Sequence, residues 1–98
     1  MAVAMFLQWD GFTREQYDAA RMLVPFDHDT APGGLFHVAA FDEHGIIHIT
    51  DIWESAEHFQ TFLTEHLLPA FAQLGITGQP NIEVLPVHAL ETPGFTRT

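Results

Sequence analysis

The chain has 98 residues, a formal net charge of −10 and only three cationic side chains, all of them arginine. Such an acidic surface repels phosphate, which excludes nucleic acids and anionic membranes as favoured partners. The lack of cysteine excludes disulfides and thiolate sites, and no apolar run approaches the roughly 20 residues of a membrane span. We expect a cytoplasmic protein with one domain over residues 1–91 and a flexible tail over 92–98.

The first quarter of the chain predicts a strand followed by a helix. Residues 2–9 form an almost entirely apolar run, which is typical of a central strand. Thr13 and Gln16 have the spacing of a capping box, in which each side chain bonds the other residue's backbone N–H. The helix that starts there carries Tyr17 on its apolar stripe and should end at Pro25.

The middle of the chain predicts a β-hairpin. Residues 35–41 and 46–53 have strand composition, and the turn residues 42–45 lie between them. The second of these strands has apolar residues at both odd and even positions, which face opposite sides of a sheet, so both of its faces should be buried.

The last part of the chain predicts a second helix and a final strand. Ser55 is a good N-cap, and apolar residues recur at helical spacing from there to Leu74. Pro69 lies inside this run and should kink or break the helix. A strand over 82–90 contains Pro86, which favours an edge position or a bulge.

The order βαββαβ predicts an α+β, ferredoxin-like fold with a four-stranded antiparallel sheet. Right-handed crossovers place both helices on one face of that sheet. The other face should then expose alternate hairpin residues, for which we expect Leu35, Ala39, Phe41, Ile46 and Ile52. An apolar patch of this size marks an interface, so we expect a homodimer in which a second copy covers it.

Three segments of the chain resemble a known group of proteins. They are residues 11–17 (GFTREQY), 51–55 (DIWES) and 80–88 (PNIEVLPVH). In these segments the chain resembles small members of the dimeric α+β barrel superfamily, and more narrowly the antibiotic biosynthesis monooxygenase-like (ABM-like) group. The resemblance implies that two four-stranded sheets join in a dimeric α+β barrel. It also implies a pocket between sheet and helices, lined by the tryptophan that ends the third strand, here Trp53.

The superfamily includes cofactor-independent oxygenases that act on phenolic or anthrone-type polyketides, haem-degrading oxygenases and many proteins of unknown function. The haem-degrading branch uses an asparagine in the first strand and a histidine on the second helix. His66 could match that histidine, but Gln8 is the only amide of the first strand.

Asp51 and His66 are the candidate catalytic residues. Asp51 shares the parity of Trp53, and a carboxylate on an apolar strand face must find a partner or stay protonated. It is either a usable base or a structural partner at the strand end. His66 follows Phe62 by four positions and Leu63 by three, so we expect it to point toward the sheet and Trp53. It is either a functional residue, as a general base or as a ligand to a metal or haem, or a hydrogen-bonded histidine of the core.

His37 and His48 lie on facing strands of the hairpin. With a loop over 42–45, residue 37 faces 50 and residue 39 faces 48, which puts both histidines on the face opposite Trp53, at the dimer interface. A one-residue register slip or bulge would reverse His37 alone. The candidate contacts for a substrate are Trp53, Phe62, Leu63, Tyr17 and His37.

The leading functional hypothesis is a cofactor-independent, monooxygenase-like enzyme acting on a small aromatic molecule. In that chemistry a base removes an acidic proton and the resulting carbanion reduces dioxygen, with neither metal nor organic cofactor. The alternatives are a non-catalytic ligand-binding dimer and a haem- or metal-binding protein of the same fold.

Overall fold

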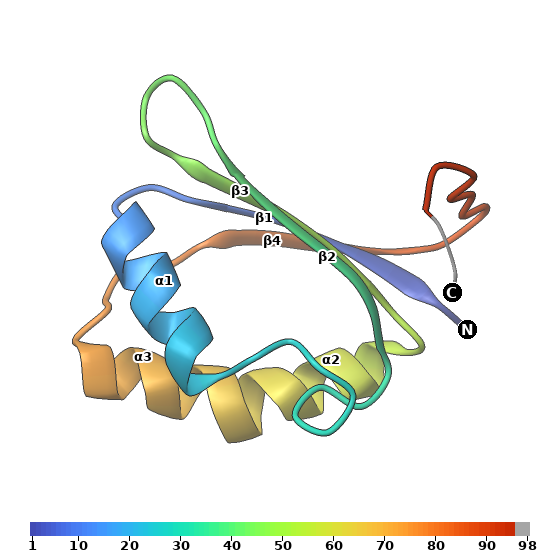
Figure 1. Cartoon of the computed structure of the whole chain (residues 1–98), viewed down its shortest axis with the longest axis horizontal. Helices are drawn as coiled ribbons and strands as arrows, with labels where there is room; N and C mark the ends of the chain where they lie inside the picture. The colour runs from blue at the N-terminus through green and yellow to red at the C-terminus, as the bar shows by residue number, and fades with distance from the viewer. Residues whose placement is uncertain (96–98) are drawn as a thin grey trace.

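The structure is a computed structural model that describes residues 1–95. In chain order its elements are β1 (Val3–Trp9), α1 (Arg14–Leu23), β2 (Gly34–Phe41), β3 (Ile47–Trp53), α2 (Ala56–Phe62), η1 (Leu63–Leu67), α3 (Leu68–Leu74) and β4 (Asn81–Pro86). The helices pack beneath one face of the sheet (Figure 1). This confirms the predicted α+β, ferredoxin-like βαββαβ fold.

The sheet has four antiparallel strands in the order β2-β3-β1-β4. The apolar run of β1 therefore lies in the centre, as predicted. β4 is an edge strand that ends at Pro86, and the Val87 N–H beyond it still donates to the Ala2 carbonyl at 2.9 Å. The missing N–H of Pro86 lies on the outer side of the strand, which suits an edge position. The prediction extended this strand to residue 90, which was four residues too long.

Both helix starts follow their sequence signals. The Thr13 hydroxyl accepts from the Gln16 N–H at 3.1 Å, and the Gln16 side-chain oxygen accepts from the Thr13 N–H at 3.0 Å. Ser55 likewise accepts from the His58 N–H at 3.1 Å. These bonds satisfy backbone donors that the first helical turn leaves free.

The β2–β3 turn differs from the prediction by one residue. Asp42 and Ile46 pair with each other, since the Asp42 N–H donates to the Ile46 carbonyl at 3.0 Å. The Ile46 N–H also donates to the Asp42 carboxylate at 3.0 Å. The loop therefore holds three residues, with Gly45 in the left-handed region at φ 80°. This pairing shifts the whole hairpin register by one residue.

The register shift changes which side chains face the helices. His37 pairs with Asp51, so it lies on the same face as Asp51 and Trp53. Ala39 and Phe41 also face the helices and pack in the core. Their assignment to the uncovered face was wrong, whereas Ile52 does lie there. We call this uncovered side the open face. Its residues on β1, β2 and β3 are Ala4, Phe6, Gln8, Phe36, Val38, Ala40, His48, Thr50 and Ile52.

The second helical segment continues through Pro69 by means of a π-helical turn. The Leu68 N–H donates to the Leu63 carbonyl, five residues back. Pro69 has no N–H for the carbonyl of Glu65 and its ring crowds that carbonyl, so a widened turn accommodates it. The helix therefore neither breaks nor ends there, but its side chains change phase.

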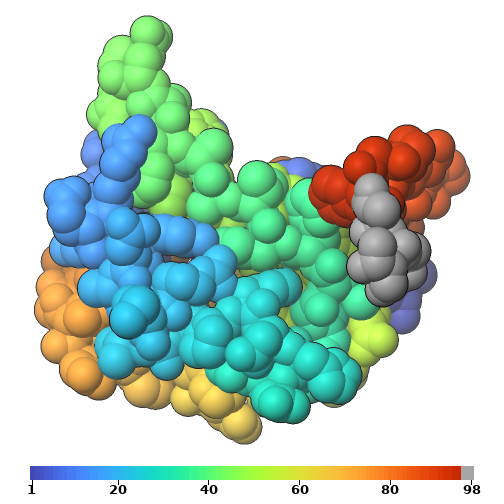
Figure 2. All heavy atoms as spheres, in the orientation of Figure 1, coloured from blue at the N-terminus to red at the C-terminus, as the bar shows by residue number. Residues whose placement is uncertain are grey.

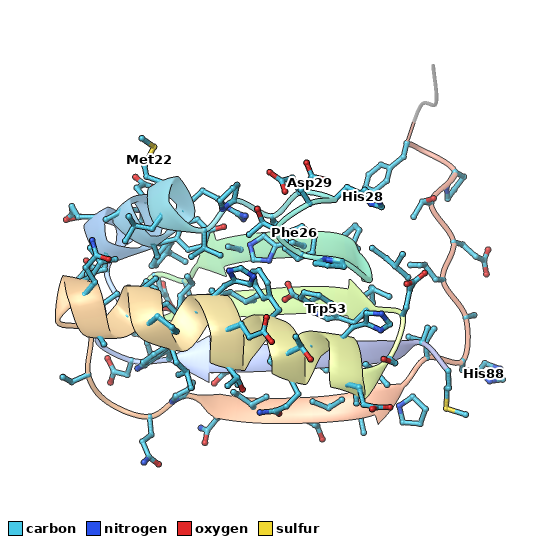
Figure 3. All side chains as sticks on the ribbon, turned by 90° about the horizontal axis from the view of Figure 1, so that it is seen from below. Met22, Phe26, His28, Asp29, Trp53 and His88 are labelled. Atoms are coloured by element: carbon cyan, nitrogen blue, oxygen red, sulfur yellow. The ribbon has the colours of Figure 1, made fainter. Side chains whose placement is uncertain are left out.

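Two apolar clusters fill the layer between helices and sheet. One surrounds Trp53, which is fully buried, and the other surrounds Trp9. Phe26, from the connection after α1, meets the Trp53 ring edge-on at 5.5 Å. Figure 3 shows Trp53 between the long helical segment and the sheet, whereas His88 lies beyond the end of the strands.

The open face is a saddle between two raised segments, the β2–β3 hairpin tip and the C-terminal segment (Figure 2). The ring of Phe95 stacks on Phe36 with the centroids 5.9 Å apart. Of the tail predicted over 92–98, residues 96–98 lie outside the described residues. No helix within residues 1–95 is long and apolar enough to cross a membrane.

Candidate functional site

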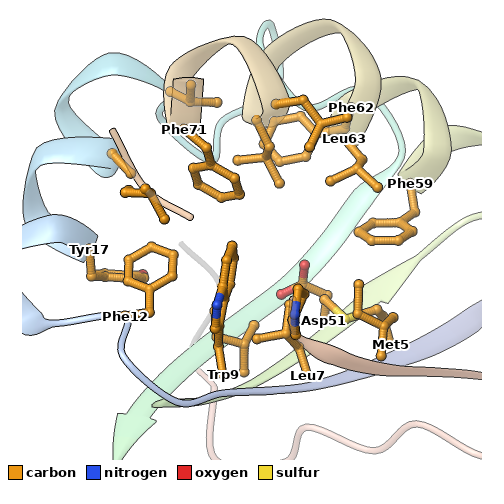
Figure 4. Close-up of a pocket in the computed structure, with 18 of the residues that line it drawn as sticks. Met5, Leu7, Trp9, Phe12, Tyr17, Asp51, Phe59, Phe62, Leu63 and Phe71 are labelled. Atoms are coloured by element: carbon orange, nitrogen blue, oxygen red, sulfur yellow. The ribbon is translucent and has the colours of Figure 1, made fainter. Parts of the chain in front are cut away.

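A cavity of about 660 Å³ lies between the helices and the covered face of the sheet. Aromatic and aliphatic side chains make most of its wall (Figure 4). The aromatic lining residues are Trp9, Phe12, Tyr17, Phe26, Phe59, Phe62 and Phe71. A mostly apolar cavity with a few convergent polar groups is the usual form of a small-molecule site.

Four polar side chains of this cavity form one hydrogen-bonded chain. The Arg21 guanidinium lies 2.8 Å from the Tyr17 hydroxyl, which lies 2.7 Å from His37 Nε2. His37 Nδ1 lies 2.6 Å from Asp51 Oδ1, and Trp53 Nε1 lies 3.2 Å from Asp51 Oδ2. We call Arg21, Tyr17, His37 and Asp51 the polar chain.

One assignment of hydrogens is consistent with every hydrogen bond of the polar chain. Asp51 as a carboxylate accepts from both ring N–H groups, His37 Nδ1–H and Trp53 Nε1–H. His37 Nε2 then has no proton and accepts from the Tyr17 hydroxyl, whose oxygen accepts from Arg21. The network thus assigns His37 the tautomer whose basic nitrogen faces Tyr17.

Local structure brings the polar chain together from three elements. Tyr17 and Arg21 lie one turn apart on α1, where side chains four positions apart are neighbours. His37 on β2 and Asp51 on β3 are directly paired across the ladder. Since the three-residue loop sets that pairing, the turn chemistry at Asp42 and Gly45 is what brings His37 to Asp51.

Two rings hold the imidazole of His37 in place. Tyr17 lies end to end with it, the ring centroids 6.1 Å apart at an interplanar angle of 8° and the Tyr17 hydroxyl on Nε2, while Phe26 packs against it at 5.2 Å with an angle of 28°. Phe26 thus packs against one face of the imidazole, and both ring nitrogens bond within the polar chain. The ring therefore has a fixed orientation, which a base in a pocket requires.

The structure places five of the seven predicted site residues at the cavity wall: Tyr17, His37, Asp51, Phe62 and Leu63. Trp53 lies behind this wall, with no exposed surface, and touches the site through its bond to Asp51. Its expected place in the pocket lining is therefore wrong, and it acts as a core aromatic that also holds the carboxylate.

His66 lies in a second, outer groove, with Asp29, His58 and Glu65 among its neighbours. The expectation that it points toward the sheet rests on unbroken α-helical spacing from Phe62. The π-helical turn replaces that spacing, so Leu67, five positions after Phe62, takes the place on the covered side. The structure does not bring His66 together with Asp51.

His37 and His48 lie on opposite faces of the sheet, which corrects their predicted pairing at an interface. His48 stays on the open face, where its Nε2 lies 2.9 Å from the Asp42 carboxylate and its Nδ1 lies 3.3 Å from the Gln8 amide. The hydrogen bonds from His48 and from the Ile46 N–H lower the pKa of Asp42 to about 2.

Sequence reasoning missed Arg21 and Trp9 as parts of the site. The signal for Arg21 was its position one turn after Tyr17, on the apolar side of α1. Trp9 is the last residue of the apolar run of β1 and gives no separate signal. Within residues 1–95, no group of three or more histidine, aspartate or glutamate side chains has a metal-binding arrangement.

The sequence matches no family model and no curated protein. Solved structures share its fold. A protein of unknown function from Nitrosomonas europaea, NE2512, is 17% identical over 96% of both chains, with a TM-score of 0.69. A putative antibiotic biosynthesis monooxygenase from Chloroflexus aurantiacus is 21% identical over 93% of this chain and 98% of its own, with a TM-score of 0.62.

SnoaB from Streptomyces nogalater, described as a cofactor-independent oxygenase, is 14% identical over 96% of this chain and 98% of its own, with a TM-score of 0.67. The resemblance to ABM-like proteins is thereby confirmed for the fold over nearly the whole chain.

Proposed function

We propose that this protein is a cytoplasmic, cofactor-independent oxygenase that acts on an aromatic molecule in the cavity beside the polar chain. The observation that carries the proposal is the His37–Asp51 pair at 2.6 Å inside an apolar cavity. The shared fold with an oxygenase described as cofactor-independent supports it.

In this proposal His37 is the base and Asp51 is its positioning residue. Asp51 keeps the proton on Nδ1, so Nε2 can take a proton from substrate, either directly or through the Tyr17 hydroxyl. Arg21 and Tyr17 then supply a positive charge and a hydrogen-bond donor beside the substrate anion that forms. The aromatic wall excludes water from the carbanion.

The overall reaction balances without an external reductant. An activated CH₂ group loses a proton to the base, and the carbanion passes one electron to dioxygen. The two radicals combine into a peroxide, which loses water to leave a carbonyl group. The CH₂ carbon is oxidised by four electrons, and dioxygen takes up the same four in the new carbonyl oxygen and in water.

The direct test is dioxygen uptake with 1,8-dihydroxyanthrone, whose CH₂ group is acidic, measured against its spontaneous oxidation. We expect His37→Ala to lower the catalysed rate by about 10²- to 10⁴-fold, the usual contribution of a general base. His66→Ala, a change in the outer groove, should leave the rate unchanged. Loss of turnover in His66→Ala with full activity in His37→Ala would refute the assignment.

A second candidate function is ligand binding without turnover. The specific observation in its favour is that the groups of the polar chain already bond to one another, Nε2 of His37 included. A binder needs no free base. Stoichiometric retention of the anthrone in the absence of oxygen uptake would favour this function.

The proposed oxygenase is a homodimer joined through the open face. Phe6 and Val38 are 40% and 45% exposed there, and the saddle between hairpin tip and C-terminal segment gives that face a concave shape (Figure 2). Exposed apolar side chains gathered on one sheet face are typical of a subunit interface.

A further inference from the structure

The indole N–H of Trp9 is a buried donor without an acceptor. Among the side chains of residues 1–95, Trp9 Nε1 is the only buried nitrogen or oxygen atom that has no hydrogen-bond partner. Trp9 as a whole is 6% exposed. Leaving a buried donor unpaired is destabilising, so an unpaired donor in a native fold calls for an explanation.

The second tryptophan of the chain allows a direct comparison of two buried indole N–H groups. Trp53 is the only other tryptophan. Its indole N–H is buried too, but it donates to the Asp51 carboxylate at 3.2 Å. The fold therefore provides an acceptor for one indole and leaves the other free.

Trp9 belongs to the cavity wall, and its unpaired donor lies at the edge of that wall, covered by Gly78. Trp9 and Gly78 both line the cavity, and a Cβ atom on Gly78 would lie 3.2 Å from Trp9 Nε1. Gly78 has φ +97°, a conformation suited to glycine, so no side chain occupies the space beside the nitrogen. An atom of a ligand could lie there after a small outward movement of the connection that contains Gly78.

One aromatic ring separates this donor from the polar chain. The Phe12 ring lies 4.9 Å from the Trp9 ring and 6.5 Å from the Tyr17 ring (Figure 4). The cavity therefore has hydrogen-bonding groups at two places with an apolar stretch between them. A ligand that meets both places has two polar groups on opposite sides of a rigid apolar frame.

We propose that Trp9 is a specificity-determining residue whose indole N–H donates to a carbonyl oxygen of the ligand, while the ligand's hydroxyl group meets Tyr17 and His37. Trp9 thus selects ligands that carry a carbonyl group at the Gly78 end of the cavity. This inference rests on the proposed function only for the identity of the cavity as the ligand site.

Two probes that differ only in the carbonyl group test the proposal by equilibrium binding. They are 6-hydroxy-1-tetralone and 5,6,7,8-tetrahydro-2-naphthol, which share the hydroxyl group and the ring frame. We expect the wild-type protein to bind the ketone about three- to tenfold more tightly, the net effect of one neutral hydrogen bond. Trp9→Phe keeps an aromatic ring but removes the donor, so it should bind both probes equally.

A second readout follows the donor itself. The two indole N–H resonances of the wild-type protein are assigned by comparison with Trp9→Phe. The ketone should move the Trp9 resonance downfield and leave the Trp53 resonance in place, while the naphthol should move neither strongly. Three results would overturn the inference. They are a Trp9→Phe variant that keeps the ketone preference, a Trp9 resonance that responds alike to both probes, and a wild-type protein that binds neither probe.

These outcomes are separate from those of the proposed function. A lost ketone preference in Trp9→Phe together with no oxygen uptake by the wild type supports the inference and refutes the oxygenase. Oxygen uptake that depends on His37, together with a ketone preference that survives in Trp9→Phe, refutes the inference alone.

Discussion

The sheet carries one Asp–His pair on its covered face and another at the hairpin end of its open face. The two pairs have similar geometry, with N–O distances of 2.6 Å for His37–Asp51 and 2.9 Å for His48–Asp42. They differ in burial, since the side chains are 15% and 7% exposed in the first pair and 42% and 33% in the second. Water screens the second pair, whereas the first has only its protein partners.

The difference shows that the same two residue types have different roles at an exposed and at a buried position. At the hairpin end, Asp42 organises a turn and sets the register, and His48 is one of several donors to it. In the cavity, Asp51 fixes the tautomer of a histidine whose other nitrogen meets the polar chain. Substitutions at the two aspartates should therefore have very different consequences.

The largest expected effect is that of Asp51→Ala. The change leaves two buried N–H groups, His37 Nδ1 and Trp53 Nε1, without an acceptor. We expect the free energy of unfolding to fall by about 3–5 kcal/mol, as when one partner of a buried pair is removed. Urea unfolding measures it, with Asp42→Ala as the matched surface variant. Equal losses in the two variants would contradict the role given to burial.

A charged substitution on the open face tests whether this face is the proposed dimer interface. Val38→Glu puts a carboxylate on a concave apolar face of a chain with net charge −10, so the dissociation constant of the proposed dimer should rise at least about tenfold. Sedimentation velocity measures this against Met22→Glu, an equally acidic change on the outer side of α1 (Figure 3). A wild-type monomer, or equal effects of the two variants, would argue against the interface.

The smallest effect concerns Asp42 and appears only in acid. Because its pKa is about 2 in the folded chain and 3.8 as a free side chain, the unfolded state binds more protons between these values. The stabilisation is therefore complete above pH 4 and is lost as the pH falls toward 2. Asp42→Asn should reduce the slope of unfolding free energy against pH in that window only. An unchanged slope would mean that the hydrogen bonds to Asp42 do not form.

The fold was predictable because its local signals agree with one another. The Thr13–Gln16 capping box, the Ser55 cap and the apolar strands all indicate the same order of elements. Pro86 identified the edge strand for a simple reason, the missing N–H. The π-helical turn was not predictable in detail, because a proline inside a helix can be accommodated by a kink, a break or a widened turn.

The candidate site was predictable only in part. Asp51 stood out as a carboxylate on an apolar strand, and the structure gives it the partners that such a group requires. Its partnership with His37 depended on one residue of loop length, which composition alone leaves ambiguous between 42–45 and 43–45. The wider π-helical turn over Leu63–Leu67 turns His66 away from the covered face of the sheet and into the outer groove. Errors of a single residue thus decide which histidine enters the cavity.

The most direct test of the central claim is the tautomer of His37, read from long-range ¹H–¹⁵N correlation spectra of the imidazole rings, with His37→Gln for assignment. If Asp51 holds the ring as the structure indicates, neutral His37 carries its proton on Nδ1, and Nε2 has the chemical shift of an unprotonated, hydrogen-bonded nitrogen. A proton on Nε2, or rapid averaging of the two tautomers, would contradict the account of His37 as an oriented base.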